Sequence, residues 1–178
     1  MSTLVYINSS NGIGKAALEV VSYAKKLGND VVVVANGNAD EASLASLGEY
    51  GASKVMVDRS VEGDSQQVTR MIASAAEATG ASTVIFSHDL TAKSVAPRLS
   101  VRMKAGLVSG AVAVPEGNTV KVNVFSGKAF GHVKINTDKK IISLLPNSIQ
   151  PEGGGSACSV EDFASNAGDS SIKVLETK

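Results

Sequence analysis

Short apolar runs alternate with amphipathic segments through the first part of this 178-residue chain, and no other feature constrains its fold as strongly. The runs are rich in β-branched residues and too short for helices, which is typical of strands buried on both faces. Strands are predicted at 3–8, 30–35, 54–57 and 83–87, and helices at 14–27, 40–50, 64–79 and 92–104. This alternation predicts a parallel sheet with right-handed crossovers and helices on both faces.

The alternation ends in the stretch 82–114, where a buried strand is followed by a helix and then by a new strand. Thr91 is the predicted N-cap of that helix, because its hydroxyl oxygen can accept a hydrogen bond from the first turn. Gly106 is the predicted C′ residue, where glycine adopts the left-handed conformation without strain. Pro97 lies inside the helical pattern and is expected to kink the helix.

The second half of the sequence has a different pattern, in which apolar and polar residues alternate. This period of two covers 120–125 and 133–136, and a further apolar run covers 141–145. Turn residues separate the runs, so the pattern predicts antiparallel strands with at least one face in water. The chain is therefore predicted to be an α/β protein of three layers, with a mostly parallel sheet flanked by helices and an antiparallel β extension.

The regular pattern is lost after residue 150. Three consecutive glycines at 153–155 and many polar residues predict a flexible loop over 151–171. The apolar residues of Ser171–Leu175 predict one last strand. We therefore divide the chain into an α/β domain at 1–150, followed by a flexible loop and terminal strand at 151–178.

The charges of the chain balance, because 17 lysines and arginines face 17 aspartates and glutamates. A net charge of zero gives no electrostatic attraction to nucleic acid or to an anionic membrane. Four phenylalanines, three tyrosines and no tryptophan offer few rings for stacking on bases. No apolar run approaches the roughly 18 residues that span a bilayer. We expect neither nucleic acid as a partner nor insertion into a membrane.

Cysteine content and the amino terminus both bear on the cellular compartment. Cys158 is the only cysteine, so no internal disulfide can form, and a reducing compartment fits this composition. The first residues lack the charged and long apolar regions of a secretory signal. The expected location is the cytoplasm.

A glycine-containing turn follows the first predicted strand and opens the first helix, where phosphate-binding loops occur. Gly12, Gly14 and Ala17 match the permissive form of the dinucleotide-binding fingerprint. The second strand, however, leads into Asn36, without the acidic residue that holds a ribose. Lys15 lacks the upstream glycine and the following hydroxyl of a P-loop. An ordinary helix-start turn is therefore favoured over a nucleotide cradle.

His88 and Asp89 follow the strand 83–87, at the edge where open α/β sheets place their ligands. A histidine beside an aspartate is a candidate general base. Adjacent side chains point in different directions, however, and no nucleophile motif accompanies the pair. Asp89 is also suited to start the helix that follows, and we favour this structural interpretation over catalysis.

The remaining histidine and the cysteine have no partners in the sequence pattern. His132 lies in a strand pattern and is expected to be a surface or packed residue. Nothing near Cys158 would lower the pKa of its thiol, which argues against a nucleophile. Two histidines and one cysteine without ligand spacing argue against a zinc site. We assign no catalytic, cofactor-binding or metal-ligating residue.

Several segments, taken in their order and spacing, resemble the alpha subunit of electron transfer flavoprotein. Residues 90–103 are similar to the family pattern G-K-x-x-x-P-R-[VL]-A-x-x-L, with Lys93, Pro97 and Arg98 at the shared positions. Residues 125–133 are similar to Y-A-G-N-A-x-x-x-V. The resemblance covers nearly the whole chain.

The chain departs from these family patterns at a few positions. Ala92 replaces the glycine before the helix lysine, and Lys128 replaces the asparagine of the second pattern. The family often has an arginine after its antiparallel strand, where this chain reads Leu144-Leu145-Pro146.

The resemblance implies an electron carrier subunit rather than an enzyme, with an adenine-nucleotide alpha-hydrolase-like fold. The chain would be the structural, subunit-interface domain of a heterodimer that includes a beta subunit. Its further partners would be flavin dehydrogenases, such as the acyl-CoA dehydrogenases of fatty acid β-oxidation. FAD belongs to the full-length heterodimer, and the family's flavin ligands lie in a second domain. No flavin ligand is therefore expected in this chain alone.

Two other protein classes share the strand-helix alternation. One is an adenine-nucleotide-binding domain of the universal stress protein kind, which needs a glycine-rich phosphate loop after a late strand. Gly106 and Gly110 lack the spacing and the hydroxyls of such a loop. The other is a small α/β hydrolase, which needs a nucleophile elbow that this sequence lacks. The stress-protein interpretation remains the alternative.

Overall fold

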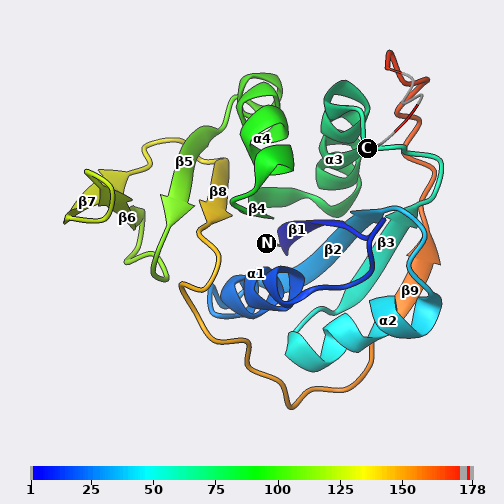
Figure 1. Ribbon diagram of the computed structural model, residues 1–178, viewed down its shortest axis with the longest axis horizontal. Helices are drawn as coiled ribbons and strands as arrows, with labels where there is room; N and C mark the ends of the chain where they lie inside the picture. The colour runs from blue at the N-terminus through cyan, green and yellow to red at the C-terminus, as the bar shows by residue number, and fades with distance from the viewer. Residues whose placement is uncertain (1, 173–175, 177–178) are drawn as a thin grey trace.

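The computed structural model describes residues 2–172 and residue 176, and Figure 1 shows its elements. The first half contributes β1 (Ser2–Asn8), α1 (Lys15–Lys25), β2 (Asp30–Asn36), α2 (Glu41–Ala45), the 3-10 helix η1 (Ser46–Tyr50), β3 (Lys54–Asp58), α3 (Ser65–Thr79) and β4 (Ala81–Ser87). The second half contributes α4 (Leu90–Met103), β5 (Gly106–Ala111), β6 (Thr119–Val124), β7 (Ala129–Lys134), β8 (Lys140–Leu144) and β9 (Ser159–Asp162). In this described part of the chain, no helix has the length and apolar character to cross a membrane.

The strands of the described residues form one nine-stranded sheet in the order β7-β6-β5-β8-β4-β1-β2-β3-β9. In this spatial order, every neighbouring pair of strands from β5 across the sheet to β9 is parallel. The pairs of β6 with β5 and with β7 are antiparallel. The predicted fold class, a mostly parallel sheet with an antiparallel extension, is confirmed.

Side chains of the sheet alternate between two hydrophobic cores, one on each face. Along β1, Leu4 and Tyr6 pack with residues of α3 and α4, while Val5 and Ile7 pack with residues of α1, α2 and η1. Figure 1 shows the same division, with α3 and α4 on one side of the sheet and α1 and α2 on the other. Because both faces are covered, the parallel strands read as continuous apolar runs.

The structure corrects the prediction for β8. The run 141–145 was expected to be antiparallel, but β8 lies between β4 and β5 and is parallel to both. Ile141, Ile142 and Leu144 are each at most 2% exposed, so this strand has no face in water. A continuous apolar run is typical of a parallel strand covered on both faces, so the run itself indicates that β8 is parallel to its neighbours.

Both predicted caps of α4 are also corrected. Asp89, not Thr91, is the N-cap, and its Oδ1 accepts a hydrogen bond from the Ala92 backbone N–H at 2.8 Å. Lys104, not Gly106, takes the left-handed conformation at the end of the helix, with φ of 54°. Gly106 instead begins β5. Aspartate outcompetes threonine here because its carboxylate is charged and meets the positive end of the helix dipole.

The segment after residue 150 contains a strand that the sequence analysis did not predict. β9 pairs in parallel with β3 and forms the edge of the sheet opposite β7. The strand predicted at Ser171–Leu175 falls largely outside the described residues. The division into 1–150 and 151–178 stays a prediction, although β9 belongs to the same sheet as the strands before it.

Candidate functional site

The chain reverses its direction of travel across the sheet at β1, because β2 and β3 lie on one side of β1 and β4 on the other. Open α/β sheets bind ligands at such a point, beyond the carboxyl ends of the strands. A hollow of about 130 Å³ lies there, between β1, β4 and the start of α1. Its lining includes Tyr6, Asn8, Gly14, Ala17, Ser87 and Asp89. The glycine turn and Asp89, both considered from the sequence, therefore meet at one place.

Polar groups at this edge of the sheet are bonded to one another. The Tyr6 hydroxyl donates to Oδ1 of the fully buried Asn36 at 2.9 Å, and Asn36 Nδ2 donates to the Val61 carbonyl at 3.2 Å. The Ser9 hydroxyl donates to the Asn36 carbonyl at 2.8 Å. Burial, and then the charge of Asp89, raises the pKa of Tyr6 far above its ordinary value, so the phenol stays neutral. This network fixes the strand ends and leaves few groups for a ligand.

The glycine turn has the geometry of a helix start. Gly14 is the N-cap of α1 and makes no side-chain cap bond, and Gly12 has a positive φ of 79°. The Lys15 ammonium donates to Asn147 Oδ1 at 2.9 Å and lies 3.5 Å from a Glu19 carboxylate oxygen. Because the lysine is bound to the loop after β8, the geometry favours an ordinary helix-start turn over a phosphate cradle.

His88 and Asp89 make hydrogen bonds to different parts of the fold. His88 Nδ1 lies 2.9 Å from the hydroxyl of Ser143, which is 1% exposed, whereas Asp89 caps α4 through Ala92. Burial, and then the charge of Lys93, lowers the pKa of His88, against the smaller opposing effect of Asp89. The ring is therefore neutral at neutral pH. Asp89 is used to cap α4, and His88 joins the end of β4 to β8. These contacts favour the structural interpretation over catalysis.

The other titratable candidates do not gather into a site. His132 lies exposed on β7, opposite Lys121 of β6. The Cys158 thiol is half-buried and donates to the Ala45 carbonyl at 3.5 Å, and burial raises its pKa, so the protonated form dominates. Among the residues described here, no three histidine, cysteine, aspartate or glutamate side chains are placed to hold a metal ion.

The hollow at the sheet edge does not fit the FAD that the family resemblance implies for the full-length heterodimer. Its volume of about 130 Å³ is well below the roughly 300 Å³ at which small-molecule pockets begin. The adjacent Tyr6 and Asn36 side chains are already paired with each other. We therefore derive no flavin chemistry from these residues.

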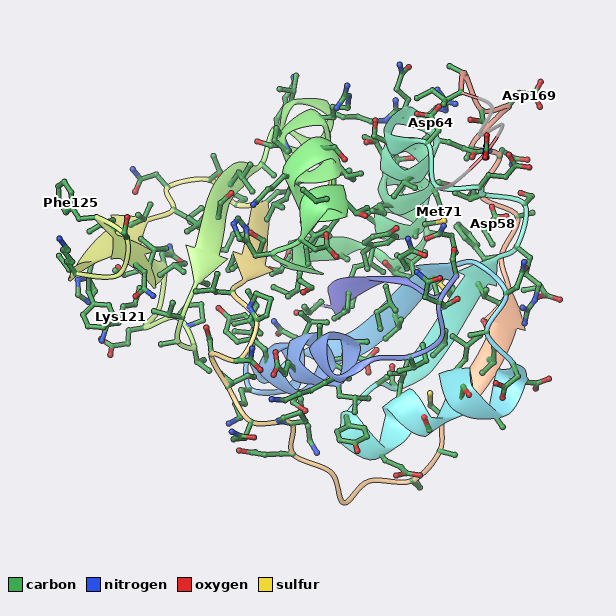
Figure 2. All side chains as sticks on the ribbon, viewed as in Figure 1. Asp58, Asp64, Met71, Lys121, Phe125 and Asp169 are labelled. Carbon is green, nitrogen blue, oxygen red and sulfur yellow. The ribbon has the colours of Figure 1, made fainter. Side chains whose placement is uncertain are left out.

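The hairpin formed by β6 and β7 is the most exposed apolar part of the sheet. Figure 2 shows Phe125 at the far end of this hairpin, away from the helices. Phe125 is 80% exposed, Phe130 58% and Val133 41%. The Lys121 ammonium lies 3.9 Å from the centre of the Phe130 ring. Among the described residues β7 is the last strand on this side of the sheet, so its outer edge offers unpaired backbone groups beside these apolar side chains, which is typical of an interaction surface.

At the opposite end of the sheet, residues 163–172, here called the tail segment, are held by buried polar groups. Figure 2 shows Asp58, Asp64 and Asp169 gathered at this end. Asp58 Oδ2 accepts hydrogen bonds from the backbone N–H and the hydroxyl of Ser165, and its Oδ1 accepts two from Ser60. Asp58 and Ser165 are 5% and 4% exposed.

Helix α3 holds the rest of the tail segment. Gln67 Nε2 donates to the Gly168 carbonyl at 2.8 Å, and Arg70 donates to the carbonyls of Ala167 and Asp169. Asp64 accepts a hydrogen bond from the Ser171 backbone N–H at 3.1 Å. The sequence analysis missed these contacts, because they join polar residues about a hundred positions apart and leave no local pattern.

Comparisons with known proteins agree with the resemblance found in the sequence. The family described as electron transfer flavoprotein domain matches residues 3–167. The chain is 30% identical over 155 residues to "Electron transfer flavoprotein subunit alpha" of Syntrophomonas wolfei, covering 81% of this chain and 48% of that protein. It is 32% identical over 145 residues to the protein of the same name from Bacillus subtilis, covering 74% and 43%. For the Mycobacterium tuberculosis protein of that name, identity is 28% over 166 residues, covering 89% and 52%. The chain thus spans about half the length of the curated relatives it matches.

Proposed function

Because the chain belongs to the electron transfer flavoprotein family, we propose that it is the amino-terminal domain of an alpha subunit of that kind. The observation that carries this proposal is the family match over residues 3–167, together with relatives that are named as alpha subunits. The domain then serves an electron carrier rather than a catalyst of bond chemistry. The small hollow at the sheet edge and the committed polar groups around it agree with an architectural function.

In this proposal, the FAD and the flavin dehydrogenases belong to the complete carrier. The relatives are about twice as long as the matched region, so groups that hold a flavin can lie outside the part that aligns here. We expect no flavin on this chain alone, and we expect the assembled carrier to work in the cytoplasm. The balanced charge of the chain supports a beta subunit that is met through apolar contact rather than through electrostatic steering.

The hairpin of β6 and β7 is the proposed surface for a beta subunit. It combines a free strand edge with exposed aromatic rings, and aromatic anchors contribute most of the binding energy of many interfaces. Phe125 and Phe130 are the two exposed aromatic rings. The turn between the strands holds Phe125 and Ser126 at positive φ.

This proposal is tested by comparing backbone amide hydrogen exchange of the chain alone with that of the chain bound to the beta subunit from the same organism. Amides of Thr119–Val124 and Ala129–Lys134 should exchange more slowly in the complex, because a partner would cover the free edge. Phe125→Asp and Phe130→Asp should each weaken subunit binding at least about tenfold. Leu90→Asp changes an equally exposed apolar residue on α4, so it is the matched control and should bind normally. Unchanged exchange in the hairpin, with normal binding by both phenylalanine variants, would contradict this interface.

A further inference from the structure

A second exposed surface lies between α3 and α4, on the face opposite α1. The two helices pack against each other, and a hollow of about 260 Å³ that is open to solvent lies on their outer surface. Its lining consists of Gln66, Thr69, Arg70, Arg98 and Arg102, which we call the arginine hollow. Three of the five side chains are arginines, which carry a permanent positive charge, so the lining is strongly basic.

Backbone carbonyls, rather than carboxylates, orient two of these guanidinium groups. Arg98 donates from Nη1 to the Ser94 carbonyl at 2.7 Å, and Arg70 donates to carbonyls of the tail segment. In the part of the chain that the structure describes, no carboxylate lies within the 4.0 Å of an ion pair to any of the three arginines. The nearby Asp64 carboxylate is already bonded to the backbone N–H groups of Gln66 and Ser171. The Asp64 carboxylate offsets part of the charge of Arg70 and Arg98, and the three arginines together leave the hollow with a net positive charge.

The outer face of α4 is also basic. Helix α4 carries Lys93, Arg98 and Arg102 and no acidic residue. Val101, which is 80% exposed, lies next to Arg102 in sequence and one turn from Arg98. Arginine beside an exposed apolar side chain is the composition typical of binding hot spots at protein interfaces.

We propose that the arginine hollow is a docking site for an acidic surface of a protein partner. The hollow is open and below the size of small-molecule pockets, so it cannot bury most of a small ligand. A membrane is disfavoured, because the apolar face of α4, with Val95, Leu99 and Met103, is already buried in the core. Carboxylates of a partner match the guanidinium groups of Arg70, Arg98 and Arg102 by charge and by hydrogen-bond geometry.

The test uses the full chain and a fluorescein-labelled polyglutamate peptide as the acidic probe, followed by fluorescence anisotropy at low salt. We expect saturable binding that weakens steeply as salt is added. The double variant Arg98→Glu with Arg102→Glu should weaken it about tenfold, since each exposed attraction is replaced by a repulsion. Lys25→Glu with Lys26→Glu makes the same change of four charge units at the exposed end of α1, on the opposite face of the sheet, and should leave the affinity unchanged. NMR shifts of backbone amides should map the peptide to Gln66–Arg70 and Arg98–Arg102.

Several results would overturn this inference. The first is a wild-type chain that does not bind the peptide at low salt, and the second is a variant with Lys25→Glu and Lys26→Glu that loses as much affinity as the arginine double variant. Inorganic phosphate that displaces the peptide at equal concentration would show a small-anion site instead. Vesicles of phosphatidylcholine and phosphatidylserine that bind through the same arginines would show a membrane site. The probe contains no flavoprotein subunit, so these outcomes are independent of the proposed function.

Discussion

Asp58 is the single residue on which the tail segment depends most. It is buried at the end of β3 and accepts four hydrogen bonds, from Ser60 and Ser165. Asp58→Asn replaces two acceptor oxygens with one and turns an amide toward donors. We predict a loss of about 2 kcal/mol in the free energy of unfolding, measured by urea denaturation. Asp162→Asn is the control, because this exposed carboxylate makes only one long ion pair, to Arg59 at 3.7 Å, and should change stability by less than about 0.5 kcal/mol.

The effect of Asp58→Asn should depend on pH in a defined direction. Burial alone would raise the pKa of Asp58, but the hydrogen bonds from Ser165 and Ser60 outweigh it and lower the pKa below its usual 3.8. The charged form is thus favoured by folding, so its stabilisation is present above about pH 4 and is lost as the pH falls through the lower folded value. The gap between wild type and variant should therefore narrow below pH 4. A gap that widens on acidification would contradict this account.

Among the secondary-structure elements, β9 depends on a close approach between η1 and the chain that leads into the strand. A methyl group on Gly48 would meet the backbone of Ser156, Ala157 and Cys158 well inside van der Waals distance. Gly48→Ala should therefore cost about 1–3 kcal/mol and speed hydrogen exchange in β9. Gly153→Ala places its methyl 3.7 Å from the Tyr50 ring, an ordinary contact, and should keep wild-type stability and exchange. Equal effects of the two substitutions would rule out this packing explanation.

The same elements show how far the sequence alone leads. The strands up to residue 87 were predicted because each is a short apolar run covered on both faces, and the exposed hairpin follows from the alternation at 120–125. β9 has one strongly apolar residue, Val160, and its position depends on contacts with β3 and η1 that no local pattern encodes. The links from Asp58 to Ser165, and the convergence of Arg70 with Arg98, are likewise set by the tertiary fold.

Across the whole molecule, the two cores lie on opposite faces of one sheet. β8, which comes late in the chain, lies in the interior of that sheet between β4 and β5. β8 separates β4 from β5, so each of these neighbours has β8 as its hydrogen-bonding partner. β9, by contrast, closes one outer edge. Loss of the central strand would open both cores, whereas loss of the edge strand would uncover β3 and the adjacent parts of α2 and η1 at one side of the sheet.

Two truncated chains test this difference. A chain that ends at Asp138 lacks β8, including Ile141, Ile142 and Leu144, and burial of each such side chain contributes about 1.5–3 kcal/mol. That sum approaches the whole stability of a typical domain, so we expect no cooperative thermal unfolding by circular dichroism. A chain that ends at Gln150 loses β9 and the tail segment but keeps the centre of the sheet. It should unfold cooperatively, with a stability lower by about 2–5 kcal/mol, because it loses the bonds to Asp58 and the packing of Val160 and Phe163 at the edges of the cores. If the shorter chain unfolds cooperatively, or the longer one does not, β8 is not the strand that unites the two cores.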